Sequence, residues 1–509
     1  MSNRIALAEL ETYLYASADI LRGHVEASDY KSFVFPLLFF KRVCDVYDEE
    51  TANAIEQYGE DGAKFMGASI HRFIVPEGYH WKNVRNTTEN VGIAIKNAFY
   101  AIEQTNEDSK THEKILEGVF GDASWTNKAA LPDEMLKNLI EHFSTKTLSI
   151  ANCPGIHDAE TPWSPWQAKL IMDLSIEYGV PVNAVEFTNE PNLMSTSGFP
   201  KGYTAAHFRR DQEIANAWVR ENYPDVLLVG PSSTDSTVIE MGPGAKGGAG
   251  IGDAMPDAVT THDLMAEYKV PMDVFTYHYY NGISERLESV MPAGHWQASQ
   301  AHTDDYLSMA GLCARSYAPI RDQYIPGAQM WVTESGDAGG GGNTWGSTYL
   351  DVLRTLNELG DFATVTDGVI FHNTLASSDY GFLKHGTFEP RPNYFAVLLW
   401  NRLMGRTVYA TGEEIREGAH VYAHSRKDGK EGVAYLVINN STEPTTVELP
   451  KAAEVYALTG NGKFRSRTML LNGRELVLGE GDALPCLCGE TVSVGTLEVA
   501  PGGCTFIVL

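Results

Sequence analysis

The spacing of apolar residues changes twice along the chain, and these two changes limit the possible fold more than any other feature. Up to about residue 150 apolar residues recur at helical spacing, as between Leu7 and Leu21. From about 160 to 403 short apolar runs alternate with amphipathic segments, and after Gly405 only short runs of alternating polarity remain. The sequence therefore predicts three domains, which are helical, α/β and all-β.

The predicted domain boundaries follow from these changes. We expect a helical domain over 1–153, with helices near 30–48, 90–105 and 133–144. A Pro- and Trp-rich stretch from Thr161 to Trp166 marks the junction. Residues 154–403 are predicted to form an incomplete (β/α)8 barrel, and 404–509 a β-sandwich with strands such as 432–439 and 446–449.

Five parallel strands are expected in the α/β domain. They span Val182–Glu190, Val226–Pro231, Asp273–Tyr280, Gln329–Glu334 and Gly368–Asn373.

Charge and composition exclude several classes of protein. The net charge is -27, and acidic residues outnumber basic ones both before and after residue 150, so neither part is a generic polyanion binder. No apolar run reaches the length of a membrane helix and no secretory signal is visible, which predicts a cytoplasmic protein without membrane contact. The six scattered cysteines are interpreted as reduced core thiols, and neither a metal nor a cofactor is expected.

Two glutamates carry the main chemical prediction. Glu190, in an Asn-Glu-Pro context, and Glu334 each end a predicted strand, and the C-terminal strand ends of a βα barrel share one rim. Glycoside hydrolysis needs one protonated and one ionised carboxyl group. We therefore predict that Glu190 and Glu334 are the catalytic pair, with carboxyl groups about 5 to 5.5 Å apart as in retaining enzymes. A pair of solvated surface acids is the alternative interpretation.

Further polar groups end neighbouring strands. His278 and Tyr280 would orient a carboxylate or bind sugar hydroxyls, and Tyr380 follows the last predicted strand. The glycines that include Gly340 and Gly341 expose backbone N–H groups able to hold an anion such as a uronate carboxylate. A structural histidine, a packing tyrosine and a mobile glycine loop remain open as alternatives.

Residues 242–247 fit the G-x-G-x-x-G string of dinucleotide-binding loops, but Pro243 and the glycines that follow do not open the required helix. Nucleotide binding is therefore not expected there.

Residues from about 160 to 509 resemble glycoside hydrolase family 79, the heparanases and β-glucuronidases of the (β/α)8 retaining clan. Asn189-Glu190 and Glu334 match the clan's acid/base and nucleophile, and the sequence after Leu471 is similar to the family's β-sandwich. The resemblance implies a hydrolase of β-glucuronides. It implies that Asn189 contacts a sugar hydroxyl, and that His278 and Tyr280 support the nucleophile. It assigns the glucuronate carboxylate to three further residues, which are Gly340, Gly341 and Tyr380.

Residues 1 to about 150 resemble the helical N-terminal domain of type I restriction-modification methyltransferase subunits. Segments such as Leu38–Arg42 and Phe120–Asp122 carry this resemblance. It implies contact with DNA or with restriction-modification subunits. No Pro-Pro dipeptide exists, so the methyltransferase Asn-Pro-Pro-Phe motif is absent. A non-catalytic DNA-modification module fused to a glycosidase fragment is therefore the alternative function.

The two resemblances together indicate a chimera. The helices before residue 150 stand where the first three barrel strands belong, so the barrel is expected to be incomplete. Both an active hydrolase and one inactivated by this loss stay open.

Overall fold

The computed structural model describes residues 17, 20–21, 25–26, 29–106, 114–144, 149–177, 181–234, 258–267, 269–411, 418, 420–479 and 483–509. The chain divides into two compact units: one comprises 1–147 with 176–180, and the other 148–175 with 181–509. Most of the predicted helix between Leu7 and Leu21 and all of the 242–247 motif lie outside the described residues.

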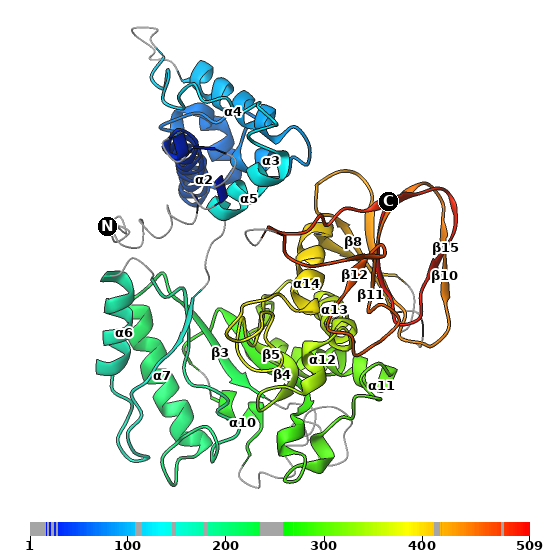
Figure 1. The fold of residues 1–509 in the computed structure, drawn as a ribbon. Coiled ribbons are helices and arrows are strands. Elements are labelled where there is room, and N and C mark those ends of the chain that lie inside the picture. The colour runs from blue at the N-terminus through cyan, green and yellow to red at the C-terminus, as the bar shows by residue number, and fades with distance from the viewer. Residues whose placement is uncertain are drawn as a thin grey trace. The chain divides into compact units, whose positions relative to one another are not determined.

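The first unit is helical, as the apolar spacing predicts (Figure 1). Its main helices are α2 (Tyr30–Met66), α3 (Trp81–Arg85), α4 (Val91–Thr105) and α5 (Asp133–Ser144), with a 3-10 turn, η2 (Gly67–Ile70). Helix α2 runs well past the predicted end at 48, and its backbone leaves helical geometry at Gly59, where φ is 72°. Aromatic rings join the helices, since Phe40 of α2 and Phe99 of α4 pack edge to face with ring centroids 5.5 Å apart.

A six-stranded parallel sheet forms the centre of the second unit, in the order β1-β2-β3-β4-β5-β6. The strands are β1 (Ile150–Asn152), β2 (Ala184–Glu186), β3 (Leu227–Ser233), β4 (Val274–Ile283), β5 (Gln329–Gly339) and β6 (Ile370–His372). The sequence predicts β2 to β6 but misses β1, in which Ile150 is the one large apolar residue, so no apolar run marks this strand. β1 belongs to the second unit, although it precedes the domain boundary predicted at 153.

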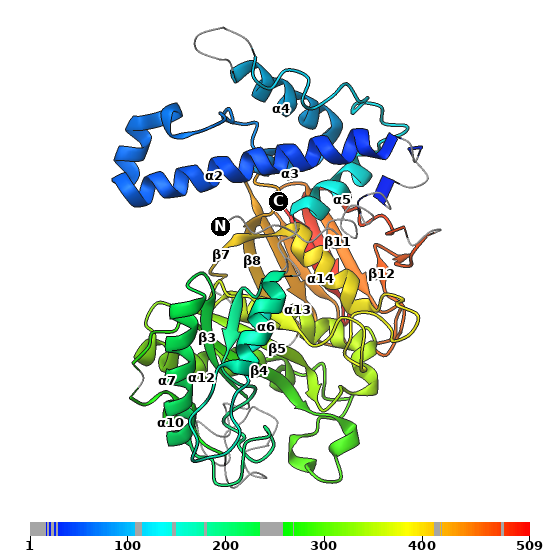
Figure 2. The ribbon, with the colours of Figure 1, turned by 90° about the vertical axis from the view of Figure 1, so that its left-hand side faces the viewer.

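Helices connect successive strands and pack on the outer face of the sheet (Figure 2). They are α6 (Trp166–Glu177), α7 (Ala205–Asn222), α10 (Thr261–Met265), α11 (Asp304–Leu307), α12 (Met309–Tyr324) and α13 (Leu350–Ala363), with 3-10 turns η3 (Glu285–Leu287), η4 (Pro292–Gly294) and η5 (Thr344–Ser347). A large apolar core containing Phe208, Phe275 and Tyr317 fills the space between. The other face carries a smaller cluster that includes Val229 and Trp331. Both faces are apolar, as in parallel sheets of α/β proteins.

After α14 (Pro392–Leu403) the chain forms antiparallel sheets. Their strands are β7 (Met404–Tyr409), β8 (His420–Arg426), β9 (Val433–Ile438), β10 (Thr445–Leu449), β11 (Ala453–Thr459), β12 (Leu470–Leu471), β13 (Arg474–Glu475), β14 (Glu490–Val492), β15 (Gly495–Val499) and β16 (Cys504–Val508). Helices α13 and α14 share one core with β8, β9, β11 and β16. The predicted boundary at 403 coincides with the end of α14, and as a domain boundary it stays a prediction.

The cysteines correct one prediction. Cys44, Cys153, Cys313 and Cys504 are buried thiols, but Cys486 and Cys488 form a disulfide. Their Cα atoms are 5.4 Å apart, within the range that a disulfide spans. The reduced state expected for this pair is therefore wrong, because two residues separated by one position can meet without help from the rest of the fold.

No helix in the described part of the chain is long and apolar enough to cross a membrane.

Candidate active site

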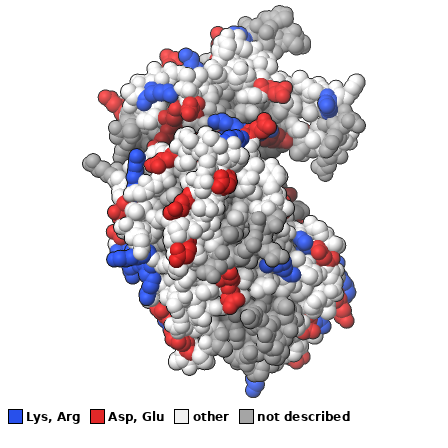
Figure 3. All heavy atoms as spheres, turned by 90° about the vertical axis from the view of Figure 1, so that its right-hand side faces the viewer, with Lys and Arg blue, Asp and Glu red and all other residues white. Residues whose placement is uncertain are grey.

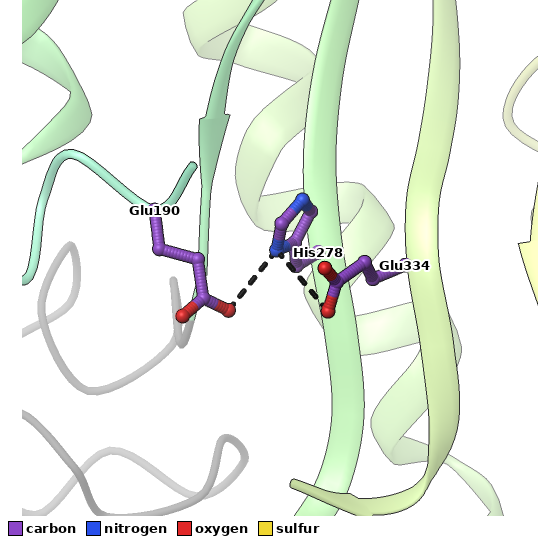
Figure 4. Close-up of side chains that lie close together, drawn as sticks. All are labelled: Glu190, His278 and Glu334. Carbon is purple, nitrogen blue, oxygen red and sulfur yellow. Dashed lines mark hydrogen bonds and ion pairs between the residues drawn. The ribbon is translucent and has the colours of Figure 1, made fainter. Parts of the chain in front are cut away.

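Glu190, His278 and Glu334 meet at the C-terminal edge of the parallel sheet (Figure 4). His278 lies on β4 between the two acids, and its Nδ1 is 3.0 Å from Glu190 Oε1 and 3.8 Å from Glu334 Oε2. The three interacting atoms lie within 4.8 Å of one another. The two acids are partly exposed, at 23% and 33% of their side-chain surface, while His278 is 1% exposed. A buried imidazole therefore holds two solvent-accessible carboxyl groups close together.

The loop after β2 fixes Glu190 in an unusual backbone conformation. Its φ of 43° lies in the left-handed region, which costs a non-glycine residue about 1 to 3 kcal/mol. Neighbouring bonds compensate, because the Glu190 carbonyl accepts from the N–H of Leu193 at 3.0 Å and from Ser197 Oγ at 2.6 Å. The Asn192 side chain bonds both backbone groups of Thr234, which joins this loop to the end of β3. Strain retained in this way is typical of functional sites.

Strand register places the groups around Glu334. His278 and Glu334 are register partners on β4 and β5, next to an irregularity at Tyr277/His278. Tyr280 donates its hydroxyl to Glu334 Oε2 at 2.7 Å and accepts from Asn373 Nδ2 at 2.7 Å. Asn373 also reaches Glu334 Oε2 at 3.4 Å. Two neutral donors thus hold one carboxyl oxygen of Glu334 in place.

The environment of His278 favours the imidazolium. Burial acts against the charged form, but the hydrogen bond to Glu190 and the charges of Glu334, Glu190 and Glu186 outweigh it and raise the pKa of His278 to about 9. Burial and the charge of Glu334 raise the pKa of Tyr280, so this residue stays a neutral donor.

A cavity of about 470 Å³ opens beside these groups, in the size range of sites for small ligands. Asn189, His278 and Glu334 line it together with Glu186, which accepts from Thr333 Oγ1 at 2.7 Å. The rest of the lining comes from Thr333 on β5, Phe371 on β6, Ile150 and Asn152 on β1, and Ser149 just before β1.

The glycines lie further along β5. Gly340 and Gly341 have positive φ values of 86° and 103° and are not among the described residues that line the cavity. Tyr380 connects them to the site, because its ring is 6.3 Å from that of Tyr280 and a Cβ on Gly342 would be 2.8 Å from Tyr380 Cδ1. Of the eight predicted residues, His278 and Tyr280 contact the two acids, Asn189 lines the cavity with Glu334, and Tyr380 lies beside Tyr280, while Gly340 and Gly341 contact neither acid among the described residues.

The same three side chains are a possible cation site. Two carboxylates and an imidazole within 4.8 Å are ligands that several divalent ions accept. The hydrogen bond between His278 and Glu190 also explains their convergence without an ion.

Sequence reasoning missed Asn373, Glu186 and Arg286. Asn373 ends a predicted strand, so the strand-end rule that selected Glu334 applies to it equally. Glu186 lies inside the predicted strand 182–190 and Arg286 in the 3-10 turn η3, where the sequence carries no comparable signal.

Comparison with known proteins identifies relatives for both parts. The chain is 26% identical over 457 residues to heparanase-like protein 1 of Arabidopsis thaliana, covering 81% of this chain and 79% of that protein. It is 28% identical over 288 residues to the baicalin-β-D-glucuronidase of Scutellaria baicalensis, covering 50% of this chain and 54% of that protein. It is also 26% identical over 214 residues to the inactive heparanase-2 of Homo sapiens, covering 37% and 36%.

Residues 10–143 match a second, unrelated family, the HsdM N-terminal domain. The chain is thus homologous to heparanases and β-glucuronidases over most of its length, and its residues 10–143 match the HsdM N-terminal domain. Both resemblances drawn from the sequence are confirmed.

Proposed function

We propose that this protein is a retaining glycoside hydrolase that acts on β-glucuronides, with Glu190 as acid/base and Glu334 as nucleophile. The observation that carries the proposal is the convergence of two partly exposed carboxyl groups on either side of His278. One oxygen of each acid lies within 4.8 Å of the other, which supports the short carboxyl separation of a retaining enzyme over the about 6.5 to 9.5 Å of an inverting one.

The proposed reaction has two steps. A Glu334 oxygen attacks the anomeric carbon while the glycosidic bond breaks and Glu190 gives its proton to the departing oxygen. Water then attacks the same carbon, Glu190 takes the proton from that water, and Glu334 leaves as a carboxylate. Tyr280 and Asn373 hold the Glu334 carboxyl group in place for this attack, and His278 lies 3.8 Å from the same oxygen.

The proposed substrate class rests on the relatives and on the glycine loop, which consists of Gly340, Gly341 and Gly342 after β5. One relative bears the name of a glucuronidase, and the N–H groups of Gly340 and Gly341 offer an anion site together with the Tyr380 hydroxyl. In the proposed complex they hold the uronate carboxylate, while Asn189 contacts a sugar hydroxyl beside the cavity it lines. A glucuronide-containing oligosaccharide fits these contacts.

The proposal also includes the type of barrel and of C-terminal domain. Six parallel strands with helices outside correspond to strands three to eight of a (β/α)8 barrel, so we infer that two strands rather than three are lacking. The C-terminal antiparallel sheets correspond to the β-sandwich, because residues of β9, β10, β11, β15 and β16 share a separate apolar cluster. Loss of two strands removes part of the wall of the sugar site, and an inactive heparanase is among the relatives.

Hydrolysis of an aryl β-glucuronide by the full chain tests the function. We expect release of the aryl alcohol, initial formation of the β-anomer of glucuronic acid seen by proton NMR, and loss of at least about 1000-fold in kcat for Glu334→Gln. Glu389→Gln is the matched control, because Glu389 is 66% exposed and pairs only with Lys384 among the described residues. Equal rates for wild type and Glu334→Gln, or initial release of the α-anomer, would refute the retaining assignment.

A second proposal concerns the first unit. Its match to the HsdM N-terminal domain favours binding of DNA or of restriction-modification subunits. Figure 3 shows acidic and basic side chains interspersed on the face it displays, and acids outnumber bases up to residue 150. Because phosphate binding needs clustered positive charge, a protein subunit is the better-supported partner. Sedimentation of the full chain with duplex DNA or with a purified methyltransferase subunit tests this, and co-migration with neither would remove the proposal.

A further inference from the structure

We propose that Arg286 is a positioning residue that shapes the glycine loop after β5 and thereby sets the preference of the site for a sugar carboxylate. This inference rests on the proposed function. It assigns a role to a side chain that contacts neither catalytic acid and that no sequence motif marks.

The glycine loop is held in a backbone shape that other residues rarely adopt. Gly340, Gly341 and Gly342 have φ values of 86°, 103° and 76° in succession. A Cβ on Gly342 would lie 2.9 Å from the Tyr380 backbone nitrogen, and one on Gly340 would lie 2.8 Å from a Leu287 methyl group. Three such glycines carry a large conformational entropy, so the loop needs external bonds to keep one shape.

Arg286 supplies those bonds. Its Nη1 donates to the Gly342 carbonyl at 2.8 Å, to the Gly341 carbonyl at 3.1 Å and to Ser284 Oγ at 3.3 Å. Ser284 in turn donates its hydroxyl to the same Gly342 carbonyl at 2.6 Å. The guanidinium and the hydroxyl thus fix the direction of two successive carbonyl groups on the side of the loop that faces η3.

Asp379 joins the loop to the segment that carries Tyr380. Its carboxylate accepts from Arg286 Nη2, and its backbone N–H donates to the Gly341 carbonyl at 3.1 Å. On the far side of this segment Arg391 donates to the Ser378 and Asp379 carbonyls at 3.0 and 2.7 Å. Arg286 therefore fixes the spacing between the glycine backbone and Tyr380, the groups proposed to hold the carboxylate.

The backbone N–H groups of the glycine loop that have no acceptor in the protein indicate a site for an anion. The Gly339 carbonyl accepts from the N–H of Ser284 at 2.9 Å, which orients the peptide group that carries the N–H of Gly340. Among the described residues, the N–H groups of Gly340 and Gly341 have no protein acceptor, whereas that of Gly342 donates to Ala338. Two adjacent free donors on a braced loop suit a planar carboxylate, and a sugar with a hydroxymethyl group in its place cannot use both.

Three variants of the full chain distinguish the effect of the Arg286 hydrogen bonds from the effect of its positive charge. Arg286→Ala removes the bonds and the charge, Arg286→Lys keeps the charge but not the planar fork, and Lys384→Ala removes a charge from an exposed pair nearby. Binding of D-glucuronate and of methyl β-D-glucoside is measured by calorimetry, and hydrolysis of the matching aryl glycosides is measured in parallel. We expect Arg286→Ala and Arg286→Lys each to weaken glucuronate binding, and to raise KM for the glucuronide, by about tenfold. Binding of the glucoside and kcat should stay within about twofold, and Lys384→Ala should behave as wild type.

Each outcome of these measurements either supports or refutes the positioning role of Arg286. If Arg286→Lys retains wild-type binding, charge alone acts and the positioning role is refuted. If both sugars lose binding equally, the residue is merely structural and the proposal also fails. If wild type binds glucuronate and loses it in the variants but hydrolyses nothing, this proposal holds while the proposed hydrolysis fails. If wild type binds no glucuronate, the carboxylate role of Arg286 is refuted even where hydrolysis of the neutral glycoside continues.

Discussion

His278→Gln tests the electrostatics of the candidate site in a single residue. Glutamine keeps a neutral donor near Glu190 but cannot become positively charged. The pKa of His278 rises from 6.5 to about 9 because the bond to Glu190 and the neighbouring carboxylates outweigh burial. At about 1.4 kcal/mol for each pKa unit, the protonated form contributes about 3 kcal/mol to the stability of the fold.

The sign of the effect sets the pH window. Because the pKa in the folded state is raised, this stability is fully present below pH 6.5 and is lost as the pH rises through about 9. The quantity compared is the difference in free energy of unfolding between wild type and His278→Gln. We expect this difference to be about 3 kcal/mol larger at pH 6 than at pH 10.

Urea unfolding followed by tryptophan fluorescence at pH 6, 7.5 and 10 measures this difference. His262→Gln is the matched control, since His262 lies on α10 and its Nδ1 contacts the Tyr324 hydroxyl rather than a carboxyl group. A difference between wild type and His278→Gln that does not change with pH would refute the reasoning, and so would a histidine titration by NMR that places His278 near 6.5.

Three further changes give independent tests. Tyr280→Phe removes a 2.7 Å bond to the Glu334 carboxylate and should lower kcat about 10- to 100-fold in a steady-state assay, and an unchanged kcat would contradict this. Gly342→Ala places a methyl group 2.8 Å from Tyr380 at φ 76°, and should lower the melting temperature in calorimetry, whereas Gly386→Ala meets open space and should cost less. Arg354→Met leaves two buried carboxylates without their partner and should cost about 3 to 5 kcal/mol in urea unfolding; a loss below 1 kcal/mol would show that their neutral forms suffice.

The sequence alone determined much of this protein, because the periods of apolar residues survive in any environment. It predicted α4, α5 and five of the six parallel strands, although β2 ends at Glu186 before Glu190 and β5 continues past Glu334 to Gly339. Position at a strand end follows from local pattern, and the parallel topology then brings such ends to one edge. The two family resemblances could also be read from short runs of residues.

Only the tertiary structure decided how these ends meet. The left-handed backbone of Glu190, the bond of His278 to that acid and the reach of Asn373 to Glu334 depend on register and on loop closure between segments far apart in the chain. The brace formed by Arg286 joins residues 55 and 93 positions away, and no local pattern encodes such a contact. β1 was missed for the same reason, since three residues become a strand only because β2 lies beside them.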